Sequence, residues 1–258
     1  MPNLALVTGA SSGIGRALAR LHAARGSDLI VTARREPELE ALKNELESAH
    51  GTAVHVRSMD LGAPGAAEAL CDRLDADGLV PDILVNNAGF GGHGRHVERP
   101  LERELAMIDV NVKALVALCH RIGGAMAARG SGRILNIGSS AGMMPGPGQA
   151  IYFATKAFVN SFSQALDQEL RPRGVTCTVL APGYVETEFA DVADLRGTML
   201  TKSGMRTPEQ TARAGYDAMM AGRLVAYDRA AIRLALDWLL PLAPRRAVLA
   251  TVERTQRK

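Results

Sequence analysis

The sequence is poor in the residues that define several classes of protein. Its three cysteines are widely spaced and form no CxxC pair, so we expect neither a disulfide framework nor a zinc site. The 30 basic and 27 acidic residues are spread along the chain, unlike the concentrated basic surface of a nucleic-acid-binding protein. The longest apolar stretch near the C-terminus, 234–242, is interrupted by Asp237 and Pro241 and is too short to span a bilayer. We therefore expect a cytoplasmic protein with reduced thiols, no transmembrane segment and no nucleic-acid partner.

Short apolar runs rich in β-branched residues alternate with longer helical patterns along the chain. The predicted strands are 4–8, 29–33, 54–57, 83–86, 133–137, 175–181 and 224–227. The predicted helices are 14–25, 36–49, 66–75, 101–128 and 151–170. This alternation is typical of an α/β fold with a doubly wound (Rossmann) parallel sheet, here of about seven strands. We expect one domain over residues 1–258, since α/β folds of this length are often single domains.

The first predicted strand runs into a glycine-rich turn that opens a helix. The turn has the spacing G-x-x-x-G-x-G, and its residues are Gly9, Ser11, Ser12, Gly13, Ile14 and Gly15, with Ala10 between the first two. Glycines here would let the backbone turn sharply and direct free N–H groups at the pyrophosphate of a dinucleotide. An ordinary strand-to-helix turn with incidental glycines is the alternative, and one such motif alone does not exclude it.

Tyr152 and Lys156 lie four residues apart in a helical pattern, so both side chains are expected on one face. An ammonium beside a phenol would favour the phenolate and lower the pKa of the tyrosine, which suits general acid/base catalysis. The alternative is a helix with a partly buried tyrosine and a solvated lysine.

Six segments together occur in the order and spacing of one enzyme family. They are the turn 8–15, Asn86-Asn87-Ala88-Gly89, Asn111, Ser139 thirteen residues before Tyr152, Tyr152-Phe153-Ala154-Thr155-Lys156, and Pro182-Gly183 through Thr187. By these motifs the chain resembles the short-chain dehydrogenases/reductases over nearly its whole length. The resemblance implies an oxidoreductase that transfers hydride between a nicotinamide dinucleotide and a carbonyl or alcohol.

The resemblance also implies roles for individual residues. Ser139 would bind the substrate oxygen and Tyr152 would pass a proton to or from it. Lys156 would hold the nicotinamide ribose and lower the tyrosine pKa, and Asn111 would anchor a water in the proton path. Ser140 is a rival for the serine role, but Ser139 fits the family's spacing. Further cofactor contacts implied by the resemblance are Asp60, Leu61, Asn87, Ala88, Gly89, Pro182, Gly183, Val185 and Thr187.

The end of the second predicted strand indicates which dinucleotide is preferred. Ala33 stands where an NAD enzyme places an acid to bind the ribose 2′-hydroxyl. Arg34 follows it and offers a guanidinium for a 2′-phosphate, and Arg35 is placed to assist. Two solvated arginines would explain the charge but not the missing acid, so we predict NADP(H).

The stretch after the sixth predicted strand, about 184–207, is irregular and is expected to form a substrate lid. Apolar residues crowd it and also follow Ser139, which predicts an apolar substrate pocket. These residues are Phe189, Val192, Leu195, Met199, Leu200 and Met205, with Met143, Met144 and Pro145.

Two further features favour ordinary explanations. His93 and His96 have HxxH spacing but no third ligand nearby, so a loop pair is favoured and no metal is predicted. The basic segment 245–258 is expected to form an amphipathic helix that packs on its own domain or on a neighbour, with a membrane surface as the less favoured alternative.

The helical segments 101–128 and 151–170 have more apolar surface than one sheet face needs, which predicts a homodimer or homotetramer. The resemblance implies the same two helices as subunit contacts. Two other functions stay open: a cofactor-binding regulator or scaffold without turnover, and an epimerase or dehydratase that uses the bound cofactor.

Overall fold

A seven-stranded parallel sheet forms the centre of the protein in the computed structural model, which describes residues 3–198 and 205–257. Its strands are β1 Ala5–Thr8, β2 Leu29–Thr32, β3 Val54–Val56, β4 Ile83–Asn86, β5 Gly132–Ile137, β6 Val175–Leu180 and β7 Val225–Ala226. Their spatial order is β3-β2-β1-β4-β5-β6-β7. This confirms the predicted doubly wound sheet, and the order reverses direction between β1 and β4, where ligands bind in such folds.

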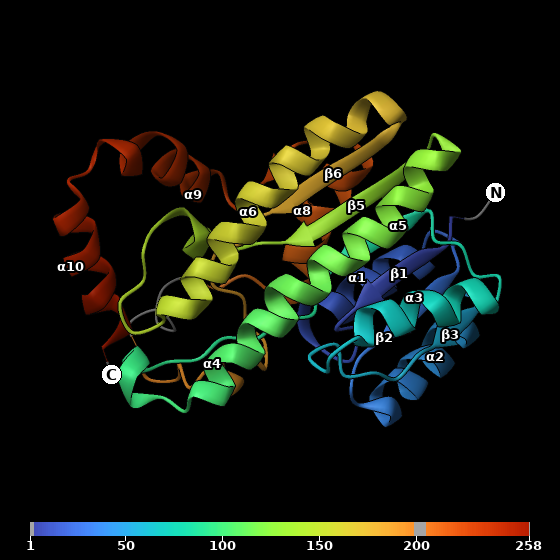
Figure 1. Ribbon diagram of the computed structural model, residues 1–258, viewed down its shortest axis with the longest axis horizontal. Helices are drawn as coiled ribbons and strands as arrows, with labels where there is room; N and C mark the ends of the chain where they lie inside the picture. Colours follow the sequence, from blue (N-terminus) through green and yellow to red (C-terminus); the bar gives the residue numbers. More distant parts are fainter. Residues whose placement is uncertain (1–2, 199–204, 258) are drawn as a thin grey trace.

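Two layers of helices cover the sheet (Figure 1). The helices are α1 Gly13–Ala23, α2 Glu36–His50, α3 Ala66–Ala76, α4 Leu101–Ile108, α5 Leu115–Arg129, α6 Ala150–Leu170 and α8 Pro208–Met220. Side chains of α1, α2 and α8 form one hydrophobic core against the strands, and those of α3, α5 and α6 form the other. Central strands such as β1 and β4 are buried along their whole length, as expected for a parallel sheet covered on both faces.

The predicted helix 101–128 is interrupted in the structure. A π-helical turn, Asp109–Ala114, separates α4 from α5. The wider turn contains Asn111, whose side chain bonds the backbone of Phe90 beside the sheet. A continuous hydrophobic pattern does not reveal such a turn, which is common at functional sites.

The chain ends in a C-terminal arm, residues 230–256, at one end of the molecule (Figure 1). It consists of α9 Ala230–Leu234, a π-helical turn Ala235–Leu239, a 3-10 turn Leu240–Leu242 and α10 Arg245–Gln256. Val252 and Gln256 of α10 are buried, so one side of this helix packs on the rest of the domain. Among the described residues, no helix has both the length and the hydropathy to cross a membrane.

Candidate active site

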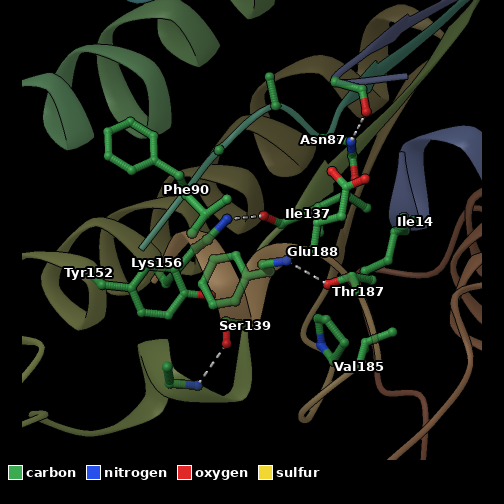
Figure 2. A pocket seen from close by; sticks show the side chains of 18 of the residues that line it. Ile14, Asn87, Phe90, Ile137, Ser139, Tyr152, Lys156, Val185, Thr187 and Glu188 are labelled. Carbon is green, nitrogen blue, oxygen red and sulfur yellow. Dashed lines mark hydrogen bonds between the residues drawn. The ribbon is translucent and has the colours of Figure 1, made fainter. Parts of the chain in front are cut away.

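A cavity of about 550 Å³ opens where the strands β1, β4, β5 and β6 end (Figure 2). Most of the residues predicted from the sequence line it. They are Gly9, Ser11, Ser12, Gly13, Ile14, Arg34, Arg35, Asp60, Leu61, Asn87, Ala88, Gly89, Ser139, Tyr152, Lys156, Pro182, Gly183, Val185 and Thr187. Gly15 and Asn111, the other two predicted residues, are not part of the lining. The volume is within the usual range for small-molecule and cofactor sites.

The glycine-rich turn fits tightly against the segment after β4. The hydroxyl of Thr8 accepts hydrogen bonds from the N–H groups of Asn87 and Ala88, both at 2.9 Å. The Asn87 amide donates back to the carbonyl oxygens of Thr8 and Gly9, at 2.9 and 3.1 Å. A Cβ at Gly15 would lie 2.4 Å from the Asn87 amide nitrogen, so only glycine at this position lets the turn pack against Asn87. Gly9 has a φ of +67°, which also favours glycine.

The two arginines after β2 have different surroundings. Arg35 is paired with Glu188 at 2.8 Å and also donates to the hydroxyl of Ser11 at 3.3 Å. The exposed side chain of Arg34 has no hydrogen bond or ion pair within the described part of the chain. Arg34 therefore lines the cavity near the end of β2 with a positive charge that no carboxylate of the described residues pairs.

The predicted catalytic side chains come together in the middle of the cavity (Figure 2). Ser139 follows β5, and its hydroxyl accepts a hydrogen bond from the N–H of Ala141 at 3.1 Å. Tyr152 is in the first turn of α6 and lines the cavity together with Ser139. Lys156, one turn further along α6, donates to the carbonyl oxygen of Ile137 at 2.7 Å. Ser140, the rival serine, also lines the cavity.

The expected lowering of the Tyr152 pKa by Lys156 is wrong. Burial raises the pKa of Tyr152 to about 12, and only the hydrogen bond with Ser139 acts in the other direction. The lysine nitrogen is 6.0 Å from the centre of the tyrosine ring and is directed at Ile137. Burial also lowers the pKa of Lys156, to about 8, because the charged form loses its hydration. Desolvation therefore dominates at both residues.

Asn111 holds the loop beside the catalytic side chains. Its amide oxygen accepts from the N–H of Phe90 at 3.1 Å, and its amide nitrogen donates to the carbonyl of Phe90 and to the hydroxyl of Thr155. Gly89 lies between Asn111 and Lys156, because a Cβ at Gly89 would be 2.8 Å from the Asn111 oxygen and 3.7 Å from the lysine nitrogen. Asn111 thus fixes the backbone from behind the cavity wall.

The stretch after β6 closes one side of the cavity. The hydroxyl of Thr187 accepts from the N–H of Phe189, the first residue of a short helix, α7 Phe189–Val192. Phe189 lies against the ring of Tyr152, with 5.2 Å between the ring centres. Val185 forms a β-bridge with Arg206, so the two ends of the predicted lid are joined.

The predicted apolar wall is partly present. Phe189, Val192, Leu195 and Met144 line the cavity. Met143, Pro145 and Met205 do not line it, and Pro145 and Met205 are exposed instead. Met199 and Leu200 lie outside the described residues.

Sequence reasoning missed a set of residues that also line the cavity. They are Met59, Phe90, Val110, Gln149, Phe153, Tyr184, Glu188, Val252, Thr255 and Gln256. Gln149 precedes α6 in a non-helical conformation, so its spacing of three residues from Tyr152 does not place it on the same helical face. The residues of α10 could not be found either, since no pattern in the sequence indicates that the arm reaches the cavity.

The two histidines of the HxxH pattern have separate partners. His93 bonds the carbonyl oxygen of Gln256 at 2.8 Å, and His96 bonds the carboxylate of Glu104 at 3.0 Å. In the part of the chain that the structure describes, no group of three or more His, Cys, Asp or Glu side chains could hold a metal ion. His93 instead attaches the end of the arm to the loop after β4.

The arrangement combines a cradle for an anionic cofactor with groups that can act on a carbonyl oxygen. The glycine-rich turn and Arg34 provide N–H groups and positive charge at one end of the cavity. A tyrosine hydroxyl, a serine hydroxyl and a lysine ammonium are in the middle. Apolar side chains line the remaining part.

Comparison with known proteins agrees with this geometry. The family model described as short chain dehydrogenase matches residues 3–195. The 3-oxoacyl-[acyl-carrier-protein] reductase FabG of Escherichia coli K12 is 38% identical over 186 residues, which cover 72% of this chain and 75% of the relative.

Two solved structures match almost the whole chain. A short-chain dehydrogenase from Sphingobium yanoikuyae in complex with NADPH is 32% identical, with a TM-score of 0.85 and coverage of 100% of this chain and 99% of that one. A bulky-bulky ketone specific alcohol dehydrogenase from Comamonas testosteroni is 27% identical, with a TM-score of 0.81 and coverage of 99% and 97%. With the matched model and the FabG relative, these likenesses establish that the chain belongs to the short-chain dehydrogenase/reductase family of oxidoreductases.

Proposed function

We propose that this protein catalyses NADP(H)-linked interconversion of a carbonyl and a secondary alcohol on a small hydrophobic substrate. The observation that carries the proposal is the convergence of Ser139, Tyr152 and Lys156 on the cavity that also contains the glycine-rich turn. A regulator that binds a cofactor without turnover would have no need of this combination. Epimerisation or dehydration would use the same groups, and product analysis separates those reactions from net reduction.

The residues present fit an NADP(H) cofactor. A Cβ at Gly13 would lie 3.0 Å from Thr187, so glycine keeps the turn open to the cavity on that side. The helix α1 begins at Gly13, so its free N–H groups suit a pyrophosphate, and Arg34 suits a 2′-phosphate. The relative from Sphingobium yanoikuyae that was solved with NADPH supports the choice. When bound, the nicotinamide supplies or accepts the hydride.

Each catalytic side chain has a defined task in this proposal. Because burial raises the pKa of Tyr152 to about 12, the hydroxyl retains its proton at neutral pH and can donate it to the developing alkoxide. Ser139, which lines the cavity beside Tyr152, binds the substrate oxygen. Lys156, whose ammonium donates to Ile137, is placed to hold the nicotinamide ribose when the cofactor is bound, and Asn111 keeps the adjoining loop in position.

The apolar lining indicates bulky hydrophobic carbonyl compounds as substrates. Phe90, Phe153, Phe189 and Leu195 line the cavity, and the relative from Comamonas testosteroni is described as specific for bulky ketones. The test is a screen of aldehydes and ketones in which NADPH absorbance at 340 nm and product identity are both measured. Bulky hydrophobic ketones should have higher kcat/KM than free sugars, and the opposite order would contradict this assignment.

We also propose that the protein is cytoplasmic. Its thiols at Cys71, Cys119 and Cys177 are free, which suits a reducing compartment.

We further propose that the protein is a homo-oligomer. Leu101 and Leu105 of α4 are 59% and 49% exposed, which supports α4 as a subunit contact. Sedimentation equilibrium should give a dimer or tetramer for the wild type and a smaller species for Leu101→Glu/Leu105→Glu. The matched control Val80→Glu changes an equally exposed residue outside α4 and should leave the assembly intact.

A further inference from the structure

Two buried glutamines form a polar end to the otherwise apolar part of the cavity. Gln149 precedes α6 and Gln256 ends α10, and each is only 3% exposed. The amide nitrogen of Gln149 donates to the amide oxygen of Gln256 at 2.7 Å. Both side chains line the cavity.

Each of these amides has one atom that is buried without a hydrogen-bond partner. These atoms are the amide oxygen of Gln149 and the amide nitrogen of Gln256. If the oxygen and nitrogen positions were interchanged in both amides, the unpartnered atoms would be the nitrogen of Gln149 and the oxygen of Gln256. The pair would still offer one donor and one acceptor. Buried polar groups without partners are costly, so a ligand group that bonded both atoms would remove this cost.

The fold holds this pair rigidly. The carbonyl oxygen of Gln256 bonds His93 at 2.8 Å, which fixes the end of α10. The backbone N–H of Gln149 donates to the carbonyl of Gly146, and its carbonyl accepts from Phe153. Because hydrogen bonds from separate loops hold the two glutamines, their positions in the cavity are fixed by the fold.

We propose that Gln149 and Gln256 recognise a second polar group on the substrate, at a distance from the carbonyl that is reduced. The group must be neutral and must donate and accept at once, as a hydroxyl or an amide does. A hydroxyl accepts from one glutamine and donates to the other. A carboxylate only accepts, so it would leave the glutamine oxygen unpartnered and would have to be buried as a charge.

This proposal rests on the proposed function, and it narrows the substrate class to hydrophobic ketones with a distal hydroxyl or amide. Gln149 and Tyr152 line the same cavity, so the second group lies in the same pocket as the reacting carbonyl. The apolar side chains of Phe153 and Val252 line the cavity together with the pair and suit the hydrocarbon part of the substrate.

The test compares matched ketones. A series of acetophenones with para hydroxyalkyl tails of increasing length is compared with analogues that have a methyl group in place of each hydroxyl. At the best tail length the hydroxyl compound should have about tenfold higher kcat/KM than its partner, the effect of one satisfied buried hydrogen bond. The corresponding carboxylates should be the poorest substrates.

Variants assign the preference to the two glutamines. Gln149→Met and Gln256→Met keep the length of the side chain and remove its polar atoms, so either should abolish or reverse the preference for the hydroxyl compound. Gln168→Met changes an exposed glutamine of α6 and should leave the preference unchanged. An amide ligand is distinguished from a hydroxyl ligand by a parallel series with carboxamide tails.

Three results would overturn the proposal: a kcat/KM ratio near one at every tail length, an unchanged preference in both methionine variants, or the highest kcat/KM for carboxylates. In all three cases, reduction of the alkyl ketones would leave the proposed function standing. Failure to reduce any ketone in the series would overturn both proposals.

Discussion

Replacing Arg34 with alanine should weaken the binding of NADPH and leave the binding of NADH nearly unchanged. Hydrogen bonds to charged groups contribute about 1.5 to 3 kcal/mol. Because Arg34 is exposed, solvent screens its charge, and we expect the lower part of this range, about 1.5 kcal/mol or roughly tenfold in Kd. The Arg34 side chain has no hydrogen bond or ion pair within the described residues, so the variant removes no such bond inside the protein.

Arg35→Ala is the matched control, since its guanidinium is already paired with Glu188 and bonded to Ser11. Its effect on NADPH binding should be smaller than that of Arg34→Ala. Isothermal titration calorimetry gives the dissociation constants of NADPH and NADH directly. Equal binding of NADH and NADPH by the wild type, or equal weakening of both by Arg34→Ala, would refute the assignment of this arginine to the 2′-phosphate.

Two other predictions concern stability. Gly89→Ala should lower Tm and activity, because its Cβ would lie 2.8 Å from the Asn111 oxygen. The control Gly124→Ala, whose Cβ would meet no atom within 4 Å, should raise the free energy of unfolding by about 0.5 to 1 kcal/mol. An unchanged Tm in Gly89→Ala would contradict this reasoning. Burial lowers the pKa of Lys156 to about 8, below its unfolded value, so the folded state binds fewer protons between about pH 8 and 10.5. Urea titrations should therefore show that the free energy of unfolding of the wild type, relative to that of Lys156→Met, increases as pH rises through this window. A difference between the two proteins that does not change with pH would exclude a lowered pKa at Lys156.

The sequence was sufficient to predict the sheet and the residues that follow its strands. Central strands of a parallel sheet are buried on both faces, so their apolar runs are distinct, and the functional residues at their carboxyl ends occur in motifs with fixed spacing. Gly9, Tyr152 and Lys156 could be placed in one cavity on these grounds.

Other features depend on tertiary structure and could not be predicted. Gln149 and Gln256 are 107 residues apart, and only the folded arm brings them together. The π-helical turn around Asn111 does not alter the hydrophobic pattern of the helix. The pKa of Tyr152 was predicted from its distance in sequence to Lys156, but burial, which the spacing does not report, determines its direction.

The substitution Tyr152→Phe tests the central claim most directly. It retains the ring, and with it the contact with Phe189, but removes the hydroxyl that holds the transferable proton. Steady-state reduction of a hydrophobic ketone and equilibrium binding of NADPH are measured on the same preparation. We predict that kcat falls by about 10²-fold or more, the usual contribution of a general acid, while the Kd for NADPH stays within about twofold of the wild type. A variant that retains most of kcat would contradict the assignment of Tyr152 as the proton donor.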